Sequence, residues 1–300
     1  MELTEEKREK KNCARLGWAL TATIVLAYVW QAMLYGADWL LYYHGVEMSD
    51  TVFYLLGLVG NYIVSLPIAY AICRRCPKDM YSPVPLEARR WVRWFVIGAA
   101  LMWLGSVIGS AVNALTYSLS GREAVSLVDD TFGAMPVGVV LLGACVLGPL
   151  CEELLFRGLI ARRLVRYGEK PAAFVSALLF ALYHGNLEQF FYAFGIGLLL
   201  AYAYFYTGRL RTSVSLHAAL NLLGAGLPML FDSDGFAVLY AVLWLVLTAL
   251  GLRFLIRGRK TQQWRHGPCE PSMRVVFGNA GMTVAIIACF VETVVTFVLS

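Results

Sequence analysis

Charged residues are scarce in this chain of 300 residues: Asp, Glu, Lys and Arg make up 15% of it, and hydrophobic residues make up 59%. So little charge excludes an ordinary soluble domain and predicts a multi-span membrane protein. The sequence also lacks the alternating segments of about ten residues that are typical of a membrane β-barrel. It lacks any repeat of roughly 20–50 residues as well, which excludes a solenoid. These absences predict an all-α fold, a polytopic bundle of transmembrane helices.

Long apolar segments are what the chain does have. A membrane-spanning helix needs about 20 apolar residues, and we count eight or nine candidates. They are residues 16–36, 51–72, 92–118, 136–159, 171–184, 188–206, 212–231, 236–256 and 274–299. The fifth is short for a span, and the ninth carries Glu292.

The same pattern divides the chain into three expected parts. Residues 1–94 hold an N-terminal tail and the first two spans, and residues 95–230 hold the bundle that carries the candidate site. Residues 231–300 hold the C-terminal spans and a polar cytoplasmic linker, which we expect to be mobile between Gly258 and Met273.

The distribution of basic residues predicts the orientation. If the N-terminus is cytoplasmic and all nine segments cross, every Lys and Arg except Arg122 falls on the cytoplasmic side. The positive-inside rule therefore predicts a multi-pass protein of the cell membrane with a cytoplasmic N-terminus. Basic clusters beside spans are also typical of contact with anionic lipid, so the expected partner is the lipid bilayer and not nucleic acid.

Two adjacent carboxylates and an arginine follow a long apolar run in the fourth segment, between Gly148 and Arg157. Each charge at the centre of a membrane helix costs about 2.5–3.5 kcal/mol on insertion scales, so such residues need partners and usually mark a function. Glu153 and Arg157 are four residues apart on one helical face, where they can pair. Glu152 lies off that face and is free to meet another group.

Two later segments supply candidate partners for Glu152. Glu152 lies 16 residues before Gly168, and His184 lies 16 residues after it. If the chain turns at Gly168, two antiparallel helices place both side chains about 24 Å from the turn, at matching depth. His217 and Asn221 are four residues apart near the start of the seventh segment, so their side chains point the same way.

Polar groups buried among apolar helices must satisfy one another or a ligand. They could fix helix packing, but packing rarely needs two histidines and two carboxylates together. They could form a proton or ion pathway, but the other spans supply almost no ionisable relay. We therefore favour hydrolysis, with the other two interpretations left open.

Three motifs stand on three separate segments: Glu-Glu-x-x-x-Arg at 152–157, Phe-x-x-x-His at 180–184 and His-x-x-x-Asn at 217–221. In this order and context they resemble the CPBP family of intramembrane proteases. That family includes the type II CAAX prenyl endopeptidases and the bacterial Abi proteins linked to bacteriocin processing and self-immunity. All three motifs match without substitution, and the resemblance covers roughly residues 95–230.

The resemblance implies a role for each residue. Glu152 and His184 are expected to position and deprotonate an attacking water, which is general-base chemistry suited to an apolar pocket. His217 and Asn221 are expected to donate hydrogen bonds to the oxyanion, and Glu153 with Arg157 is expected to form a supporting ion pair. The implied function is cleavage of a peptide or prenylated-protein substrate at a cytoplasm-facing site, near a lipidated C-terminus or in a leader peptide.

Two alternatives stay open at this point. Glu152, His184 and His217 also make a His₂Glu ligand set like that of a catalytic zinc site, although no H-E-x-x-H sequence is present. We prefer the metal-free mechanism and leave the cofactor undecided, with zinc as the candidate. The runner-up function is a non-catalytic membrane immunity or scaffold protein whose polar network serves packing.

Overall fold

The structure is a computed structural model that describes residues 3–78, 81–121, 135–231, 233–258, 264–267 and 273–299. It is 87% helical, and no strand occurs among the residues described, so the predicted all-α fold is confirmed. Eight helices in this part of the chain are long and apolar enough to cross a membrane. They are Thr4–Tyr43, Asp50–Ile72, Ala88–Leu119, Val137–Tyr167, Leu187–Thr207, Leu210–Leu230, Asp234–Gly258 and Ala280–Phe297.

The chain separates into two compact units, each of which we describe by itself. The first contains Met1–Pro77, Leu127–Gly143 and Ser272–Ala288, and the second contains Lys78–Ser126, Ala144–Pro271 and Cys289–Ser300. The three-part division predicted at residues 94 and 230 stays a prediction. The connection between the third and fourth predicted segments, which contains Arg122, lies almost entirely outside the described residues.

The first unit is organised around α1 (Leu3–Tyr43), the longest helix described. The predicted N-terminal tail belongs to this helix, which begins well before the apolar segment. Trp30 of α1 donates its indole N–H to the carbonyl of Leu56 at 2.8 Å, and Gly17 lies against the backbone of Gly281. The other helices of this unit are α2 (Asp50–Leu58), η1 (Val59–Val64), α3 (Ser65–Ile72), α6 (Val137–Val140), α14 (Met273–Phe277) and the first half of α15 (Ala280–Leu299).

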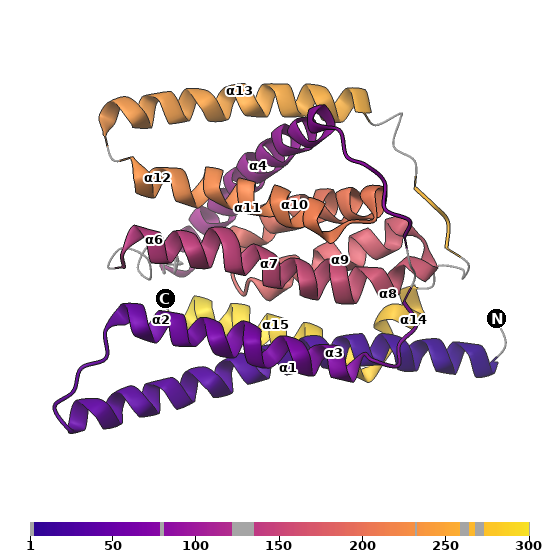
Figure 1. Cartoon of the computed structure of the whole chain (residues 1–300), viewed down its shortest axis with the longest axis horizontal. Helices are drawn as coiled ribbons and strands as arrows, with labels where there is room; N and C mark the ends of the chain where they lie inside the picture. The colour runs from indigo at the N-terminus through magenta and orange to yellow at the C-terminus, as the bar shows by residue number, and fades with distance from the viewer. Residues whose placement is uncertain are drawn as a thin grey trace. The chain divides into compact units, whose positions relative to one another are not determined.

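The second unit packs around α4 (Ala88–Ser120), which lies against α10 (Leu187–Thr207) and α13 (Asp234–Gly258) (Figure 1). Large apolar side chains fill the contact and hold these helices together. The buried core includes Trp94, Ile97, Leu200, Leu216, Leu220 and Trp244. α11 (Leu210–Asn221), η5 (Leu222–Gly226) and α12 (Leu227–Leu230) complete the seventh predicted segment.

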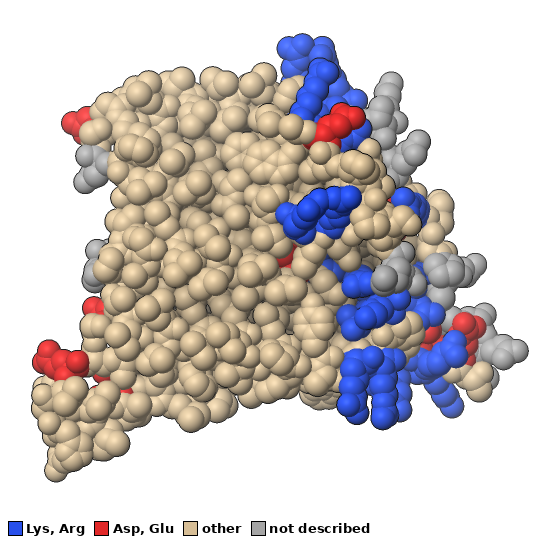
Figure 2. Space-filling model, viewed as in Figure 1, with Lys and Arg blue, Asp and Glu red and all other residues tan. Residues whose placement is uncertain are grey.

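Basic residues of this unit gather at one end of its helices. The N-terminal end of α4 and the C-terminal end of α13 lie at the same end in Figure 1, and Figure 2 shows Lys and Arg side chains clustered there. A one-sided basic distribution is what the positive-inside rule requires of a multi-pass protein. The assignment of that side to the cytoplasm stays a prediction.

The fourth predicted segment is not one regular helix. It runs through α6, the π-helical η2 (Leu141–Leu147), α7 (Gly148–Glu153), the π-helical η3 (Leu154–Ala161), α8 (Arg162–Leu164) and the 3₁₀ turn η4 (Val165–Tyr167). Pro149 is the second residue of α7 and has no amide hydrogen for the preceding turn, which favours an irregular turn there. Turns of the π type are frequent at functional sites, and here they flank Glu152 and Glu153.

The predicted turn at Gly168 is present, since Gly168 has φ +104° and α9 (Glu169–Tyr183) starts directly after it. α9 has 15 residues, which give it a length of about 22 Å, short of a hydrocarbon core of about 30 Å. It is not among the eight candidate spans. The fifth segment was expected to be short for a span, and the eight candidates agree with the lower of the two predicted numbers. The ninth segment does meet the criteria, because it is helical from Ala280.

Four residues of the polar linker after α13 make specific contacts with the second unit. Within it the structure describes residues 264–267, and these are attached to the Gly168 turn: Glu169 N–H donates to the carbonyl of Arg265 at 3.1 Å, and Arg265 N–H donates to Glu169 Oε2 at 2.9 Å. The sequence did not predict these contacts with Glu169, and the expected mobility of the linker stays a prediction.

Candidate active site

Glu153 and Arg157 form a fully buried ion pair. Arg157 Nη1 lies 2.7 Å from Glu153 Oε1, and both side chains are 0% exposed. Arg157 also donates from Nη2 to the carbonyl of Gly197 at 3.0 Å, and its guanidinium lies 4.7 Å from the centre of the Phe180 ring. A buried charge is stable when it is paired and hydrogen-bonded, so this pair anchors the start of η3 against α9 and α10.

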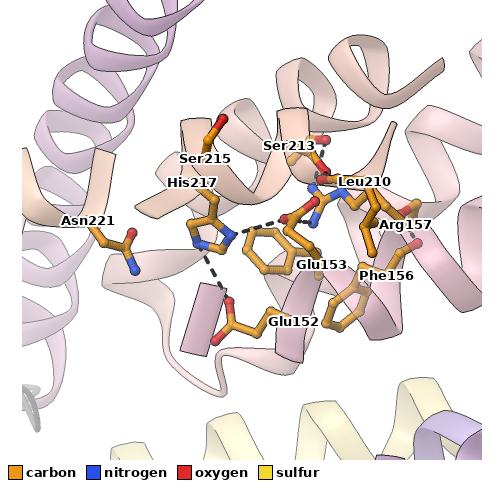
Figure 3. Close-up of polar contacts among 12 residues, drawn as sticks. Glu152, Glu153, Phe156, Arg157, Leu210, Ser213, Ser215, His217 and Asn221 are labelled. Atoms are coloured by element: carbon orange, nitrogen blue, oxygen red, sulfur yellow. Dashed lines mark hydrogen bonds and ion pairs between the residues drawn. The ribbon is translucent and has the colours of Figure 1, made fainter. Parts of the chain in front are cut away.

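The imidazole of His217 lies between the two carboxylates (Figure 3). Its Nδ1 is 3.0 Å from Glu153 Oε1, and its Nε2 is 3.6 Å from Glu152 Oε2. Because a carboxylate oxygen accepts, Nδ1 carries the proton that faces Glu153. The contact with Glu153 therefore fixes the orientation of the ring and aims Nε2 at Glu152.

Exposure separates the two adjacent carboxylates. The side chain of Glu152 is 19% exposed, whereas the side chain of His217 is 5% exposed and that of Glu153 is inaccessible. Glu152 is thus the most accessible of these three side chains. The off-face position expected for Glu152 has a physical basis, because consecutive residues on a helix point about 100° apart.

His184 lies at the end of α9 and is held by its own helix. Its Nδ1 is 2.7 Å from the carbonyl oxygen of Phe180, so Nδ1–H donates and Nε2 is left with a lone pair. The Phe180 ring meets both imidazoles edge-on, at 4.7 Å from the ring of His184 and 5.6 Å from the ring of His217. Phe180 therefore connects the two histidines and the arginine.

Asn221 lies one turn beyond His217 on α11, and its amide is engaged by the backbone. Its Nδ2 donates to the carbonyl of Ala144 at 2.8 Å, which uses one of the two N–H groups of the amide. The expectation that both side chains point the same way from one helix stays a prediction. The bond to Ala144 leaves the second N–H of Asn221 for a ligand.

The sequence analysis assigned no role to two of these groups. Phe180 belongs to a motif, and its four-residue spacing from His184 could have identified it as the partner of Nδ1. The carbonyl of Gly197 has no sequence signal, since every residue carries a carbonyl. Gly197 is constrained sterically as well: a Cβ there would lie 3.0 Å from the Cβ of Ala177.

The fit of a metal ion depends on whether the proposed ligands converge. The donor types suit zinc, since both imidazoles engage Nδ1 and present Nε2, as metal-bound histidines do. In the described part of the chain, however, no three His, Cys, Asp or Glu side chains form a group that could hold a metal ion. The arrangement does not fit a three-ligand site, and we derive no step through a metal.

These features define a class: a polytopic helical membrane protein with a buried carboxylate–imidazole network that opens at Glu152. Comparison with known proteins agrees. Residues 134–223 match the family model described as Type II CAAX prenyl endopeptidase Rce1-like. This span contains all three motifs, and the resemblance predicted from them is confirmed.

Three relatives are similar over part of their length. The membrane-embedded CAAX protease MroQ of Staphylococcus aureus (strain USA300) is 25% identical over 60% of this chain and 75% of its own. YdiL of Bacillus subtilis (strain 168), which carries the name of a membrane peptidase, is 22% identical over 60% of this chain and 75% of its own. The UPF0177 protein YbdJ of Lactococcus lactis is 34% identical over 34% of this chain and 44% of its own. No solved structure shows a significant match. The family match and the first two relatives support a membrane protease of the CAAX type.

Proposed function

We propose that this chain is an intramembrane endopeptidase in which Glu152 activates the attacking water. The observation that carries the proposal is the series of contacts Arg157–Glu153–His217–Glu152. Its first two members are fully buried, and its last member is 19% exposed. A network that served packing alone would have no need of a partly accessible carboxylate at its end.

The proposed reaction requires a proton on each ring nitrogen of His217. Glu152, Glu153 and Arg157 carry a net charge of −1, and a second proton on His217 makes the four groups neutral. In that state Nδ1–H donates to Glu153 and Nε2–H is directed toward Glu152. Neutrality lowers the cost of burying the group in an apolar environment.

In the proposed reaction, Glu152 takes one proton from water while the oxygen attacks the carbonyl carbon of the scissile peptide bond. The lone pair on Nε2 of His184 accepts a hydrogen bond from the same water and orients it. The carbonyl oxygen becomes an oxyanion, which accepts hydrogen bonds from Nε2–H of His217 and the second N–H of Asn221. Protonated Glu152 then delivers its proton to the leaving amine as the C–N bond breaks.

The substrate we propose is a peptide with a lipidated, CAAX-like C-terminus, or a hydrophobic leader peptide, cleaved on the cytoplasmic side. The name of the relative MroQ and the matched family support the first class. The membrane location supports both classes, since an apolar group partitions into lipid and concentrates the bond beside it at the membrane.

The test uses purified full-length protein in detergent and fluorescent reporter peptides with and without a prenyl group. Glu152→Gln keeps the shape and removes the base, and we expect cleavage to fall about 10²–10⁴-fold while the thermal midpoint stays close to wild type. Glu47→Gln, in an exposed loop, is the matched control and should cleave normally. Normal cleavage by Glu152→Gln would reject the protease assignment.

The same preparation distinguishes the alternatives. A scaffold protein predicts that no reporter is ever cleaved and that Glu152→Gln lowers the thermal midpoint. Elemental analysis, followed by chelation and zinc add-back, separates the metal-free mechanism from the zinc mechanism. Stoichiometric zinc together with activity that chelation removes and zinc restores would overturn the metal-free mechanism.

A further inference from the structure

The second unit contains a pocket that shares no residue with the candidate active site. Its volume is about 1710 Å³. It lies among the N-terminal end of α4, the first turn of α9, the C-terminal ends of α10 and α13, and residues 264–267. Because α4, α10 and α13 are candidate spans that begin or end here, the pocket lies at the level where the apolar part of the bilayer gives way to headgroups.

The lining is strongly basic. Five cationic side chains and one imidazole face it, against two carboxylates; they are Arg89, Arg90, Arg93, Lys170, Arg265 and His266. One of the two carboxylates, Glu169, is 4% exposed and already engaged. Tyr81 donates to its Oε1 at 3.2 Å, and burial together with Glu169 raises the pKa of Tyr81 well above its usual value, so the phenol keeps its proton.

Aromatic rings form the walls and orient the arginines. The guanidinium of Arg90 lies 4.4 Å from the centre of the Tyr206 ring, and that of Arg93 lies 5.5 Å from the Phe254 ring. Stacking of this kind leaves the N–H edge of a guanidinium accessible to an anion, although Arg93 already donates from Nη2 to the carbonyl of Phe254 at 3.1 Å. The remaining rings supply an apolar surface next to these charges; they are Trp94, Tyr167, Tyr202, Phe205 and Trp264.

The pocket wall made by residues 264–267 is held in place. The two hydrogen bonds with Glu169 fix Arg265, and the ring of Trp264 lies 5.0 Å from that of Tyr202. Gly267 lies so close to the carbonyl of Arg166 that a Cβ would overlap it. Residues 264–267 therefore close one side of the pocket through specific contacts.

We propose that this pocket binds an anionic phospholipid, with the phosphate at the arginines and the acyl chains along the aromatic wall. Arg forks match phosphate oxygens in pairs, and basic pockets between membrane helices bind anionic headgroups. The combination of charge and apolar wall selects an amphiphile over a small free anion. This site goes beyond the proposed proteolysis and does not depend on it.

The first experiment titrates full-length protein in detergent with short-chain phosphatidylglycerol or phosphatidylcholine and follows thermal midpoint and bound lipid by native mass spectrometry. We expect saturable binding of phosphatidylglycerol, at least about tenfold tighter than that of phosphatidylcholine, since each cation at an anionic headgroup contributes roughly a factor of five. Equal binding of the two lipids would overturn the proposal.

The second experiment locates the site with paired variants. Arg89→Gln with Lys170→Gln removes two exposed cations of the pocket and should weaken phosphatidylglycerol binding about 25-fold. Arg211→Gln with Arg253→Gln removes two exposed cations outside the pocket and should bind as wild type. An unchanged affinity in the first variant, or an equal loss in the second, contradicts the assignment. Lipid-free thermal midpoints verify that both variants are folded.

A third measurement distinguishes a lipid from a free phosphate. Inorganic phosphate and glycerol 3-phosphate carry the headgroup chemistry without acyl chains, and neither should raise the thermal midpoint at concentrations where phosphatidylglycerol saturates. If either one stabilises the protein as much as the lipid does, the pocket is a site for free anions and the lipid proposal is wrong.

Discussion

Nδ1 of His217 lies 3.0 Å from Oε1 of Glu153, and this oxygen also receives Arg157 at 2.7 Å. One buried carboxylate oxygen thus links the imidazole on α11 to the guanidinium on η3. The adjacent Glu152 takes no part in that link and meets the other side of the imidazole. The two adjacent glutamates therefore have different roles: Glu153 stabilises the fold, and Glu152 is proposed to act in catalysis. Substituting each one separately should produce different effects.

Glu153→Gln is predicted to destabilise the protein. It leaves Arg157 buried without a counter-charge, and removing one partner of a buried ion pair costs about 3–5 kcal/mol. We expect a clearly lower thermal midpoint in detergent than for wild type. Glu152→Gln is the matched control at the next position and should melt near wild type. Equal thermal midpoints for the two variants would contradict the structural role assigned to Glu153.

Asn221→Ala is predicted to lower kcat rather than to raise KM. The second N–H of Asn221 is proposed to meet an oxyanion that exists only after attack, and loss of one such donor costs about 2.7–4 kcal/mol, or 10²–10³-fold in kcat. Steady-state kinetics on the best reporter peptide measures kcat and KM separately. The competing structural role through Ala144 predicts a lower thermal midpoint with kcat preserved.

Gly185→Ala is predicted to be more damaging than the same change at Gly45. Both glycines have positive φ, +65° and +73°, so both variants carry about 1–2 kcal/mol of backbone strain. A Cβ at Gly185 would also lie 2.8 Å from Cγ of Glu292, whereas Gly45 has open space around it. Because Gly185 follows His184, cleavage should fall in that variant and not in Gly45→Ala. Comparable thermal midpoints and activities in the two variants would show that the side chain of Glu292 moves aside at little energetic cost.

Gly17→Ala is predicted to weaken helix packing in the first unit and to lower the thermal midpoint. A Cβ there would overlap the backbone of Gly281, and close helix contacts in membranes depend on small residues. Gly36, on the same helix, has nothing within 4 Å, so Gly36→Ala should be neutral or slightly stabilising. Thermal midpoints of the two variants decide the matter, and an unchanged midpoint in Gly17→Ala would contradict the contact.

Apolar length predicts most of the fold, because a span is a property of one segment. Eight of the nine expected segments are long and apolar enough. α9 is the exception, since its charged start at Glu169 and the glycine at 185 leave 15 helical residues. The π turns on either side of Glu152 have no simple signal beyond Pro149, and the attachment of residues 264–267 depends on a carboxylate about 100 residues away in the sequence.

The site was predictable where spacing acts within one helix and less so between helices. The Glu153–Arg157 pair follows from a separation of four residues. The position of His217 between two carboxylates does not follow from spacing along the chain. Spacing does not determine which imidazole nitrogen contacts which carboxylate oxygen. The hydrogen bond from Asn221 to Ala144 was equally unpredictable from the sequence. Every residue has a backbone carbonyl, and only the folded structure determines which one accepts.

The shortness of α9 has a consequence for hydration. A helix of about 22 Å that starts at one face of a bilayer ends inside the apolar layer, and the non-helical residues 184–186 then lie below the surface. Exposed peptide groups at that depth are stable only inside protein or beside water. A wet vestibule at the tip of α9 would bring the hydrolytic solvent directly to His184, so the break in the helix would serve as the entry for one of the two reactants.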